Sequence, residues 1–175
     1  TSEALLQASH EVQAIFQNAS IGIALTRDRV IVRCNQTFAA MLGYTQAAIT
    51  NKAARSIFPS NEAYAKIGQD ASALLAAGAP FRTEQKFLHR DGNLISCSVS
   101  ASAVDPKHPE WGTIWLFDDV TAERQQATEL HSALMRIEAI KKNAPLGILF
   151  TVNRRITDCN AQFNQMFGFV QDTAI

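Results

Sequence analysis

A repeat at an offset of 125 residues (143 − 18) constrains this chain more than any other feature of its sequence. The segment Asn18–Ile23 (NASIGI) recurs as Asn143–Ile148 (NAPLGI). The same offset pairs Arg29 with Arg154, Ile31 with Ile156, Cys34–Asn35 with Cys159–Asn160, Phe38 with Phe163, and Met41–Tyr44 with Met166–Phe169. Apolar and glycine positions are kept while the positions between them vary, which is typical of one fold built twice.

The first copy begins with a predicted β-hairpin that leads into a helix. Two β-rich runs, Ile21–Thr26 and Val30–Cys34, flank a polar turn at 27–29, and this spacing is typical of a hairpin. Asn35 can cap the helix that follows, and Gly43 can end it.

The rest of the first copy predicts the elements that complete an antiparallel sheet. We expect short helical turns at 46–49 and 55–58, a longer helix at 61–77, and strands at 81–89, 94–104 and 113–117. The Asp91–Gly92 pair between two of these strands is a strong signal of a tight turn. The order β-β-α-α-α-β-β-β predicts an α+β fold, a five-stranded antiparallel sheet with helices on one face.

Amphipathic helices are predicted on both sides of this domain. Apolar residues recur at 3-4-3 spacing in a polar background, as Leu5, Ala8, Val12 and Ile15 and as Ala127, Leu130, Leu134 and Ile137. This spacing is typical of helices that pair with another helix. The seam consists of Leu5, Val12 and Ile15 in the first helix and of Leu130, Leu134 and Ile137 in the second. We expect a homodimer formed through these helices, because a short helix is only marginally stable alone.

The charge balance argues against several classes of partner. The 16 Lys and Arg residues are matched by 16 Asp and Glu residues, whereas a general nucleic-acid surface needs an excess of basic side chains. Apolar runs fall well short of the roughly 20 residues that span a bilayer, and the N-terminus lacks the pattern of a signal peptide. We therefore expect a cytoplasmic protein that contacts neither nucleic acid nor membrane.

The sequence contains no recognisable motif for catalysis or metal binding. Cys34, Cys97 and Cys159 are far apart and form no CxxC pair, so buried reduced thiols are expected and structural zinc is not. There is no Ser/His/Asp order with a nucleophile elbow, no Gly-rich phosphate loop and no His pair at metal-binding spacing. We expect no enzyme activity and no metal.

Five short motifs occur in a fixed order along the first copy. They are Gly22 in the first strand, Cys34–Phe38 with Met41–Tyr44, Phe81–Glu84, His89–Asn93, and Gly112–Thr121. Together they resemble the PAS family of bacterial sensory domains, of the type found in tandem ahead of diguanylate cyclase or histidine kinase outputs. The resemblance implies a role in signal transduction, with an output domain that is absent from this chain.

The repeat and the resemblance together divide the chain into four parts. These are an N-terminal amphipathic helix (1–17), a complete PAS domain (18–121), a connecting coiled-coil-like helix (122–142) and the truncated start of a second PAS domain (143–175). The second copy keeps the first hairpin and helix but lacks the three strands that would complete its sheet. We expect it either to pair with a partner's sheet edge or to be loosely ordered and open to proteolysis.

The resemblance implies a ligand site between the sheet and the helices. Strand alternation puts Thr113, Trp115 and Phe117 on one face, and similarity to flavin-binding members makes it the inner one. The full set of pocket candidates is Phe38, Ile57, Phe58, Ile67, Leu74, Phe87, Cys97, Val99, Thr113, Trp115 and Phe117. Because Trp115 and Phe117 are bulky, we expect a tightly filled core, with a small apolar or aromatic ligand as the alternative.

Two cofactors common in the family do not match these residues. A photoactive flavin site needs a Cys in an Asn-Cys-Arg-type helix, but the matching helix reads Ala54–Phe58, and Cys34 and Cys97 lie on predicted strands. A haem sensor generally needs an axial His on the long helix or just before it, and residues 45–80 contain none. We therefore predict no cofactor, and haem stays an open alternative.

Asp119 and Thr121 join the last strand to the exit helix. Thr121 suits the N-cap of that helix, and the adjacent carboxylates suit its positive end. A change in strand packing could then tilt the helix, since a bias of a few kcal/mol switches a two-state element. The leading hypothesis is a sensory or relay module of a multidomain signalling protein. The alternatives are a constitutive dimerisation module without ligand, and a sensor of a small apolar ligand or haem.

Overall fold

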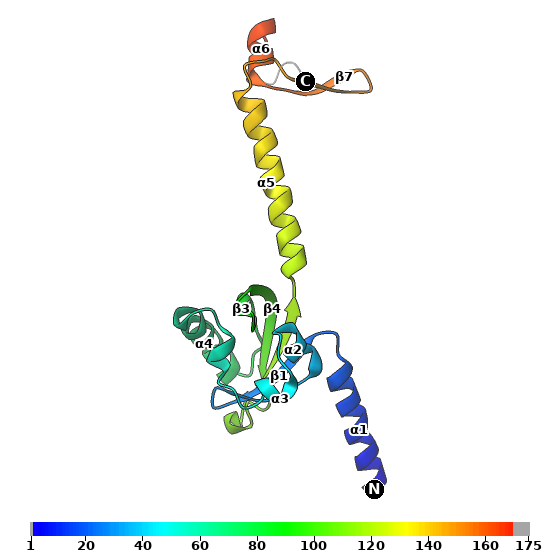
Figure 1. Cartoon of the computed structure of the whole chain (residues 1–175), viewed down its shortest axis with the longest axis vertical. Coiled ribbons are helices and arrows are strands. Elements are labelled where there is room, and N and C mark those ends of the chain that lie inside the picture. The colour runs from blue at the N-terminus through cyan, green and yellow to red at the C-terminus, as the bar shows by residue number, and fades with distance from the viewer. Residues whose placement is uncertain (1, 170–175) are drawn as a thin grey trace. The chain divides into compact units, whose positions relative to one another are not determined.

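The structure, a computed structural model, describes residues 2–169 of the chain (Figure 1). It consists of two compact units, residues 1–122 and residues 123–175. Among the described residues, no helix is long and apolar enough to cross a membrane.

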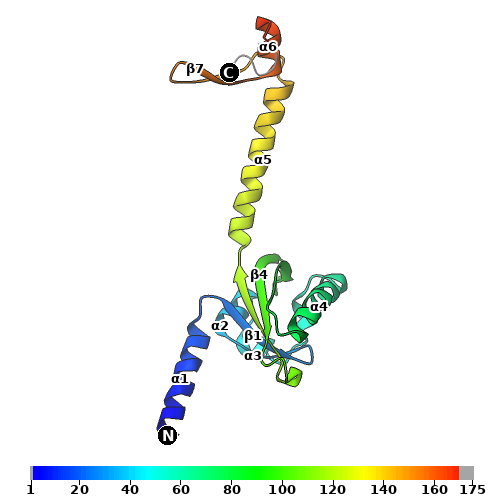
Figure 2. The ribbon, with the colours of Figure 1, turned by 180° about the vertical axis from the view of Figure 1, so that it is seen from behind.

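A five-stranded antiparallel sheet forms the centre of the first unit (Figure 2). Its strands are β1 (Gly22–Arg27), β2 (Val30–Cys34), β3 (Phe81–Leu88), β4 (Leu94–Ala103) and β5 (Thr113–Asp119). They lie in the order β2-β1-β5-β4-β3, so β1 pairs with β2 on one side and with β5 on the other. The predicted α+β fold with a five-stranded antiparallel sheet is confirmed.

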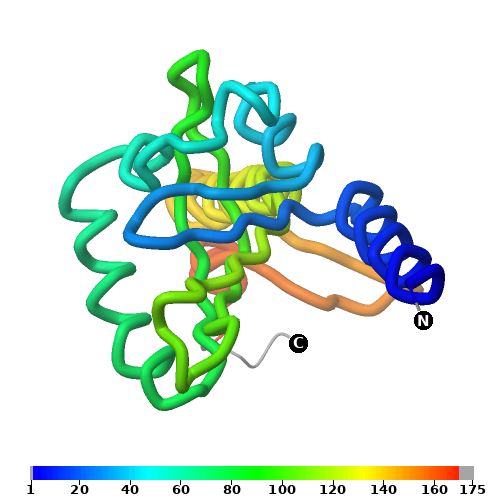
Figure 3. The backbone as a smooth tube through the Cα atoms, turned by 90° about the horizontal axis from the view of Figure 1, so that it is seen from below, coloured from blue at the N-terminus to red at the C-terminus, as the bar shows by residue number. Residues whose placement is uncertain are grey.

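The first unit also contains helices, and polar caps set where several of them begin. They are α1 (Ser2–Asn18), α2 (Gln36–Met41), α3 (Gln46–Ile49), the 3-10 helix η1 (Ala54–Ile57), α4 (Asn61–Ala76) and the 3-10 helix η2 (Pro109–Trp111). Asn35, Thr45 and Ser60 each accept a hydrogen bond from the amide three residues ahead, as N-caps do. α2 packs on β1, while α4 packs on β3 and β4 (Figure 3).

The hydrophobic core lies between these helices and the sheet. Phe38, Leu42, Ile49, Phe87 and Cys97 are each at most 1% exposed. Burying a side chain of this size stabilises a fold by about 1.5–3 kcal/mol, so these positions account for much of the cohesion of the first unit.

The second unit repeats the opening of the first in detail. α5 (Thr121–Asn143) leads into β6 (Leu149–Val152), β7 (Arg155–Cys159) and α6 (Ala161–Phe167). The β6–β7 register and its irregularity fall 125 residues after those of β1–β2. The prediction that this copy keeps a hairpin and a helix is confirmed.

The apolar seam predicted on the flanking helices lies on exposed surface. All six of its residues are more than half exposed. They are Leu5, Val12 and Ile15 on α1, and Leu130, Leu134 and Ile137 on α5.

Candidate functional site

A cavity of about 570 Å³ opens between the β1–β5 part of the sheet, η1 and α4. Ligand cavities in proteins commonly measure about 300–1,000 Å³, so this one is large enough for a small molecule. Its wall includes Ala24, Ile31, Phe38, Ile57, Phe58, Tyr64, Ile67, Phe87, Trp115 and Phe117, together with smaller and polar residues.

Aromatic rings form a continuous chain through this wall. The Phe117 ring lies 4.8 Å from Phe38 and 5.2 Å from Phe87, measured between ring centroids. Phe58 continues the chain, with 5.1 Å to Phe87 and 5.1 Å to Tyr64. Tilted and edge-to-face contacts of this kind stabilise aromatic clusters beyond the area they bury. The inner surface of the cavity is therefore apolar and aromatic.

Polar contacts hold β5 and the loop that precedes it against β1 beside the cavity. Trp115 Nε1 donates to Thr26 Oγ1 at 2.9 Å, and Arg27 Nε donates to the Trp111 carbonyl at 3.0 Å. Gly112 has a φ of 98°, and a Cβ there would lie 2.2 Å from the Thr26 carbonyl oxygen. Glycine is therefore required where this loop crosses β1.

Eight of the eleven predicted pocket residues lie in the cavity wall. They are Phe38, Ile57, Phe58, Ile67, Phe87, Thr113, Trp115 and Phe117. The other three, Leu74, Cys97 and Val99, do not line the cavity.

The prediction for Leu74 is wrong because α4 turns its neighbour inward. Leu74 is 42% exposed, while Leu75 packs against the core. The buried positions of α4 are Ile67 and Ala71, and Leu75 continues them at the four-residue spacing that keeps side chains on one helix face.

Cys97 and Val99 point inward, as strand alternation predicts, but they lie in solid core beside the cavity. Both are at most 1% exposed, and Cys97 Sγ lies 3.8 Å from Met41 Sδ. Burial, with the negative charges of Asp119 and Asp118, raises the pKa of the Cys97 thiol to about 12. This thiol is therefore protonated and unreactive at neutral pH.

At this end of the sheet a cavity lies beside the contacting rings of Phe38, Phe87 and Phe117, and the expectation of a core without ligand stays a prediction. Trp115 lines this cavity and donates its indole N–H to Thr26. Sequence reasoning also missed Tyr64, Gly68 and Ser72 of α4, which line the cavity. Space of this kind depends on side-chain direction, which residue size alone does not reveal.

The wall lacks the side chains that the two cofactors considered from the sequence generally require, and the expectation of no cofactor stays a prediction. Among the described residues that line the cavity there is no histidine, cysteine or methionine. A photoactive flavin needs a cysteine facing it, and haem in sensors of this kind generally needs an axial histidine. Cys34 lies outside the wall, where burial raises the pKa of its thiol.

Asp119 and Thr121 attach the start of α5 to the sheet. Asp119 Oδ1 accepts from the Thr121 amide at 3.0 Å and from the Thr121 hydroxyl at 2.5 Å. The Thr121 oxygen in turn accepts from the Ser96 amide of β4 at 3.0 Å. Thr121 is the first residue of the helix, so the expectation that it serves as the N-cap is wrong: its hydroxyl binds β4.

Asn35 attaches the end of α1 to the same domain, which the sequence revealed only in part. Its Oδ1 accepts from the amides of Phe38 and Ile23, both at 2.9 Å. Its Nδ2 donates to the carbonyls of Phe16 at 2.9 Å and Ile21 at 3.0 Å. The cap on Phe38 was predicted and is confirmed. The bond to α1 was missed because it depends on how a separate helix packs.

Comparisons with known proteins agree with this geometry. The family described as "PAS fold" matches residues 17–125, and the one described as "PAS domain" matches residues 135–174. The sensor protein TdiS of Thauera aromatica is 28% identical over 142 residues, which cover 81% of this chain and 26% of that protein. The sensor histidine kinase TmoS of Ectopseudomonas mendocina is 25% identical over 146 residues, which cover 82% of this chain and 15% of that protein. The chain thus spans about a quarter of the first relative and less of the second.

Solved structures show the same fold. The PAS domain of a LuxR-family transcriptional regulator from Burkholderia thailandensis, in complex with ethanol, matches with a TM-score of 0.57 and 29% identity, covering 62% of this chain and 96% of that one. A domain of a sensory box histidine kinase/response regulator from Geobacter sulfurreducens matches with a TM-score of 0.53 and 20% identity. This match covers 68% of this chain and 100% of that one. The second likeness concerns the fold alone.

Proposed function

The chain belongs to the PAS family, and on that premise we propose that it senses a small apolar molecule and relays its binding through the exit helix α5. It is a sensory module of signal transduction, like the PAS-containing sensor proteins that it resembles. The observation that carries the ligand proposal is the cavity of about 570 Å³ with its aromatic wall. In this proposal the chain itself performs no catalysis.

The wall favours a neutral ligand of one or two rings. Phe38, Phe87 and Phe117 are at most 5% exposed and offer only ring surface to the interior. The charged residues that line the cavity are confined to the end of β1 and the turn after it, where Arg27, Asp28 and Arg29 lie. An engineered cavity of about 150 Å³ already holds benzene, so the present volume accommodates a substituted or fused ring.

The relay starts in the cavity wall and ends at α5. Phe117 lies two residues before Asp119 on β5 and therefore on the same face of the strand. Asp119 and Thr121 then connect β5 and β4 to the first turn of the helix. A ligand that moves Phe117 or Trp115 would shift these bonds, and a difference of a few kcal/mol between two helix positions is enough for a switch.

We further propose that the module works as a homodimer within a longer cytoplasmic protein. Its support is the exposed seam on α1 and α5, since two such helices bury their apolar residues by pairing in a coiled coil. The relatives are several times longer than this chain, which supports an output domain elsewhere in the protein. The same seam favours the second candidate, a constitutive dimer that binds no ligand.

Calorimetric titration of the full chain with benzene and with indole separates the two candidates. We expect saturable binding of at least one of these probes at a stoichiometry of one per chain. Ala24→Leu is the matched control, because Ala24 is 1% exposed and lines the cavity, so its enlargement should abolish binding. Absence of binding in a protein that remains dimeric by light scattering would favour the constitutive dimer.

A further inference from the structure

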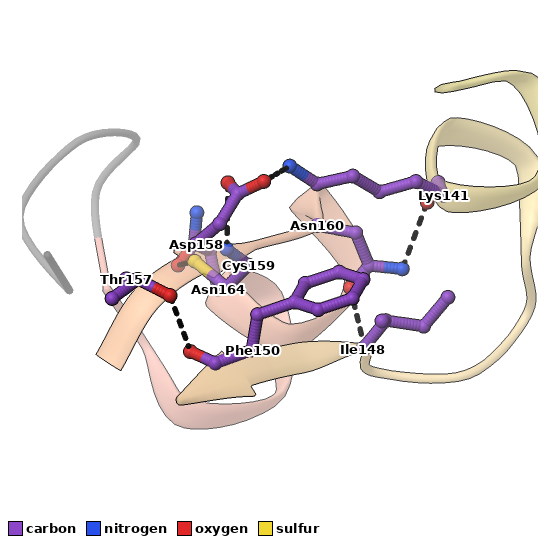
Figure 4. Close-up of polar contacts among 8 residues, drawn as sticks. All are labelled: Lys141, Ile148, Phe150, Thr157, Asp158, Cys159, Asn160 and Asn164. Atoms are coloured by element: carbon purple, nitrogen blue, oxygen red, sulfur yellow. Dashed lines mark hydrogen bonds and ion pairs between the residues drawn. The ribbon is translucent and has the colours of Figure 1, made fainter. Parts of the chain in front are cut away.

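The end of α5 is attached to the second PAS copy by one buried side chain, Asn160 (Figure 4). Asn160 Oδ1 accepts from the amides of Ile148 at 2.8 Å and Phe163 at 3.0 Å. Asn160 Nδ2 donates to the carbonyls of Lys141 at 2.9 Å and Leu146 at 2.8 Å. Its exposure is 3% in a copy that is otherwise largely open to solvent. All four hydrogen-bonding positions of the carboxamide are therefore used.

We call this set of four hydrogen bonds around one asparagine side chain the Asn joint. The same joint exists at Asn35, and each of its four partners lies 125 residues before its counterpart. Phe16 and Ile21 correspond to Lys141 and Leu146 as acceptors, and Ile23 and Phe38 correspond to Ile148 and Phe163 as donors. All partners are backbone groups, so the side chains around the joint are free to differ. Only a planar group of this length with two acceptor and two donor positions fits, which excludes Asp, Leu and Gln.

A second contact supports the joint with different chemistry in the two copies. In the first copy the Arg33 guanidinium lies 4.7 Å from the centroid of the Phe16 ring. In the second copy the equivalent positions carry Lys141 and Asp158, which form an ion pair. The contact between the helix end and the second strand is kept while its chemistry has changed from cation–π to ionic.

We propose that Asn35 and Asn160 are positioning residues that couple each incoming helix to the copy that follows it. Each one binds, at once, the helix end, the linker, a residue in or directly before the first strand, and the helix that carries Phe38 or Phe163. In the first copy that helix and strand also supply Phe38 and Ala24 to the cavity wall. The regulatory part of this proposal rests on the proposed function: α5 receives the signal at Thr121 and delivers it to the second copy at Asn160.

Hydrogen exchange on the full chain, followed by NMR, tests the joint. Asn160→Asp keeps the acceptors for Ile148 and Phe163 but removes both donors and sets a negative charge beside two carbonyls. We expect the amide of Ala144, which donates to the Ile140 carbonyl at 2.9 Å, to exchange at least about tenfold faster, as in local opening of a helix end.

Asn143→Asp is the matched control for this experiment. Asn143 is exposed and donates to the Ala139 carbonyl of its own helix. The Asn143→Asp substitution places the same negative charge at the same helix end, so both variants share any effect on the helix dipole. The Asn160 variant should exceed this control by about tenfold. Equal exchange rates of the Ala144 amide in the two variants would show that Asn160 does not hold the end of α5.

A double variant tests the coupling. Thr121→Val removes the bond to Ser96 at the start of α5, and we expect it to change the exchange rate of the Ile148 amide in the wild-type background. In the Asn160→Asp background the same substitution should have no further effect at Ile148. If Thr121→Val changes the exchange rate of the Ile148 amide equally in both backgrounds, the start of α5 is not coupled to the second copy through Asn160. Neither measurement needs a ligand, so a failure of the proposed cavity function would leave both results interpretable.

Discussion

The two PAS copies share their first hairpin and helix but differ in what covers them. In the first copy Ala24, Phe38 and Leu42 are at most 1% exposed. Their counterparts in the second copy are half-buried or open, with Leu149 at 40% and Phe167 at 62%. β1 pairs with β2 and β5, whereas β6 pairs only with β7 among the described residues. Local sequence is thus enough to form the hairpin, the helix and the Asn joint, but the core requires strands that come much later in the chain.

The largest expected contrast between the copies concerns Phe38 and Phe163. Phe38→Ala removes a fully buried ring that contacts Phe117 and should lower the free energy of unfolding by about 3–5 kcal/mol. Phe163→Ala should lower it by less than about 1 kcal/mol, because the ring is only partly buried. Urea unfolding followed by far-ultraviolet circular dichroism, which reports the helices and strands of both units, measures both. Similar losses for the two variants would show that the second copy has a core of its own.

Thiol reactivity should separate the copies almost as strongly. Cys34 is 3% exposed, and Cys97 is fully buried with a pKa raised to about 12; Cys159, the counterpart of Cys34, is half-buried. At pH 8 we expect a disulfide reagent to modify Cys159 at least about a hundredfold faster than the other two, because the thiolate is the reactive form. Mass spectrometry of partially labelled protein identifies the sites. Cys159→Ser is the control and should abolish the fast phase.

A stabilising substitution in α4 should act on the first copy alone. Gly68 lies within the helix, and a Cβ there would meet nothing within 4 Å. Gly68→Ala should therefore raise the stability of the sheet-containing unit by about 0.5–1 kcal/mol through helix propensity. The urea midpoint measured by tryptophan fluorescence reports this, since Trp111 and Trp115 both belong to the first unit. A lower midpoint would mean that the residue faces tighter packing than the structure shows.

The smallest expected difference is in acid sensitivity at the two joints. A hydrogen bond from Lys141 lowers the pKa of Asp158, so this contact stabilises the fold at neutral pH and is lost as the pH falls through the lowered pKa. The Arg33–Phe16 contact has no acid group and should not change over that range. Carboxyl-detected NMR titration gives the pKa of Asp158, which should rise toward its ordinary value in Lys141→Ala. An unchanged pKa of Asp158 in that variant would show that Lys141 does not lower it.

The sequence predicted the features that depend on near neighbours. The hairpin, the Asn35 cap and the succession of helices and strands along the chain follow from local patterns and from the repeat. Leu74 was misplaced because it sits beside Leu75 at the edge of an apolar helix face, where one residue decides between core and solvent. The open volume of the cavity and the donor half of Asn35 could not be predicted, because they depend on how side chains turn and on where α1 ends in space.

Filling the cavity should alter the attachment of α5 to the sheet. Hydrogen exchange of the full chain with and without saturating benzene tests this at two amides, Ser96 and Val120, which take part in that attachment. We expect benzene to change their exchange rates by at least about threefold, and we expect no such change in the Ala24→Leu variant. Binding of benzene that leaves both amides unaltered would contradict it.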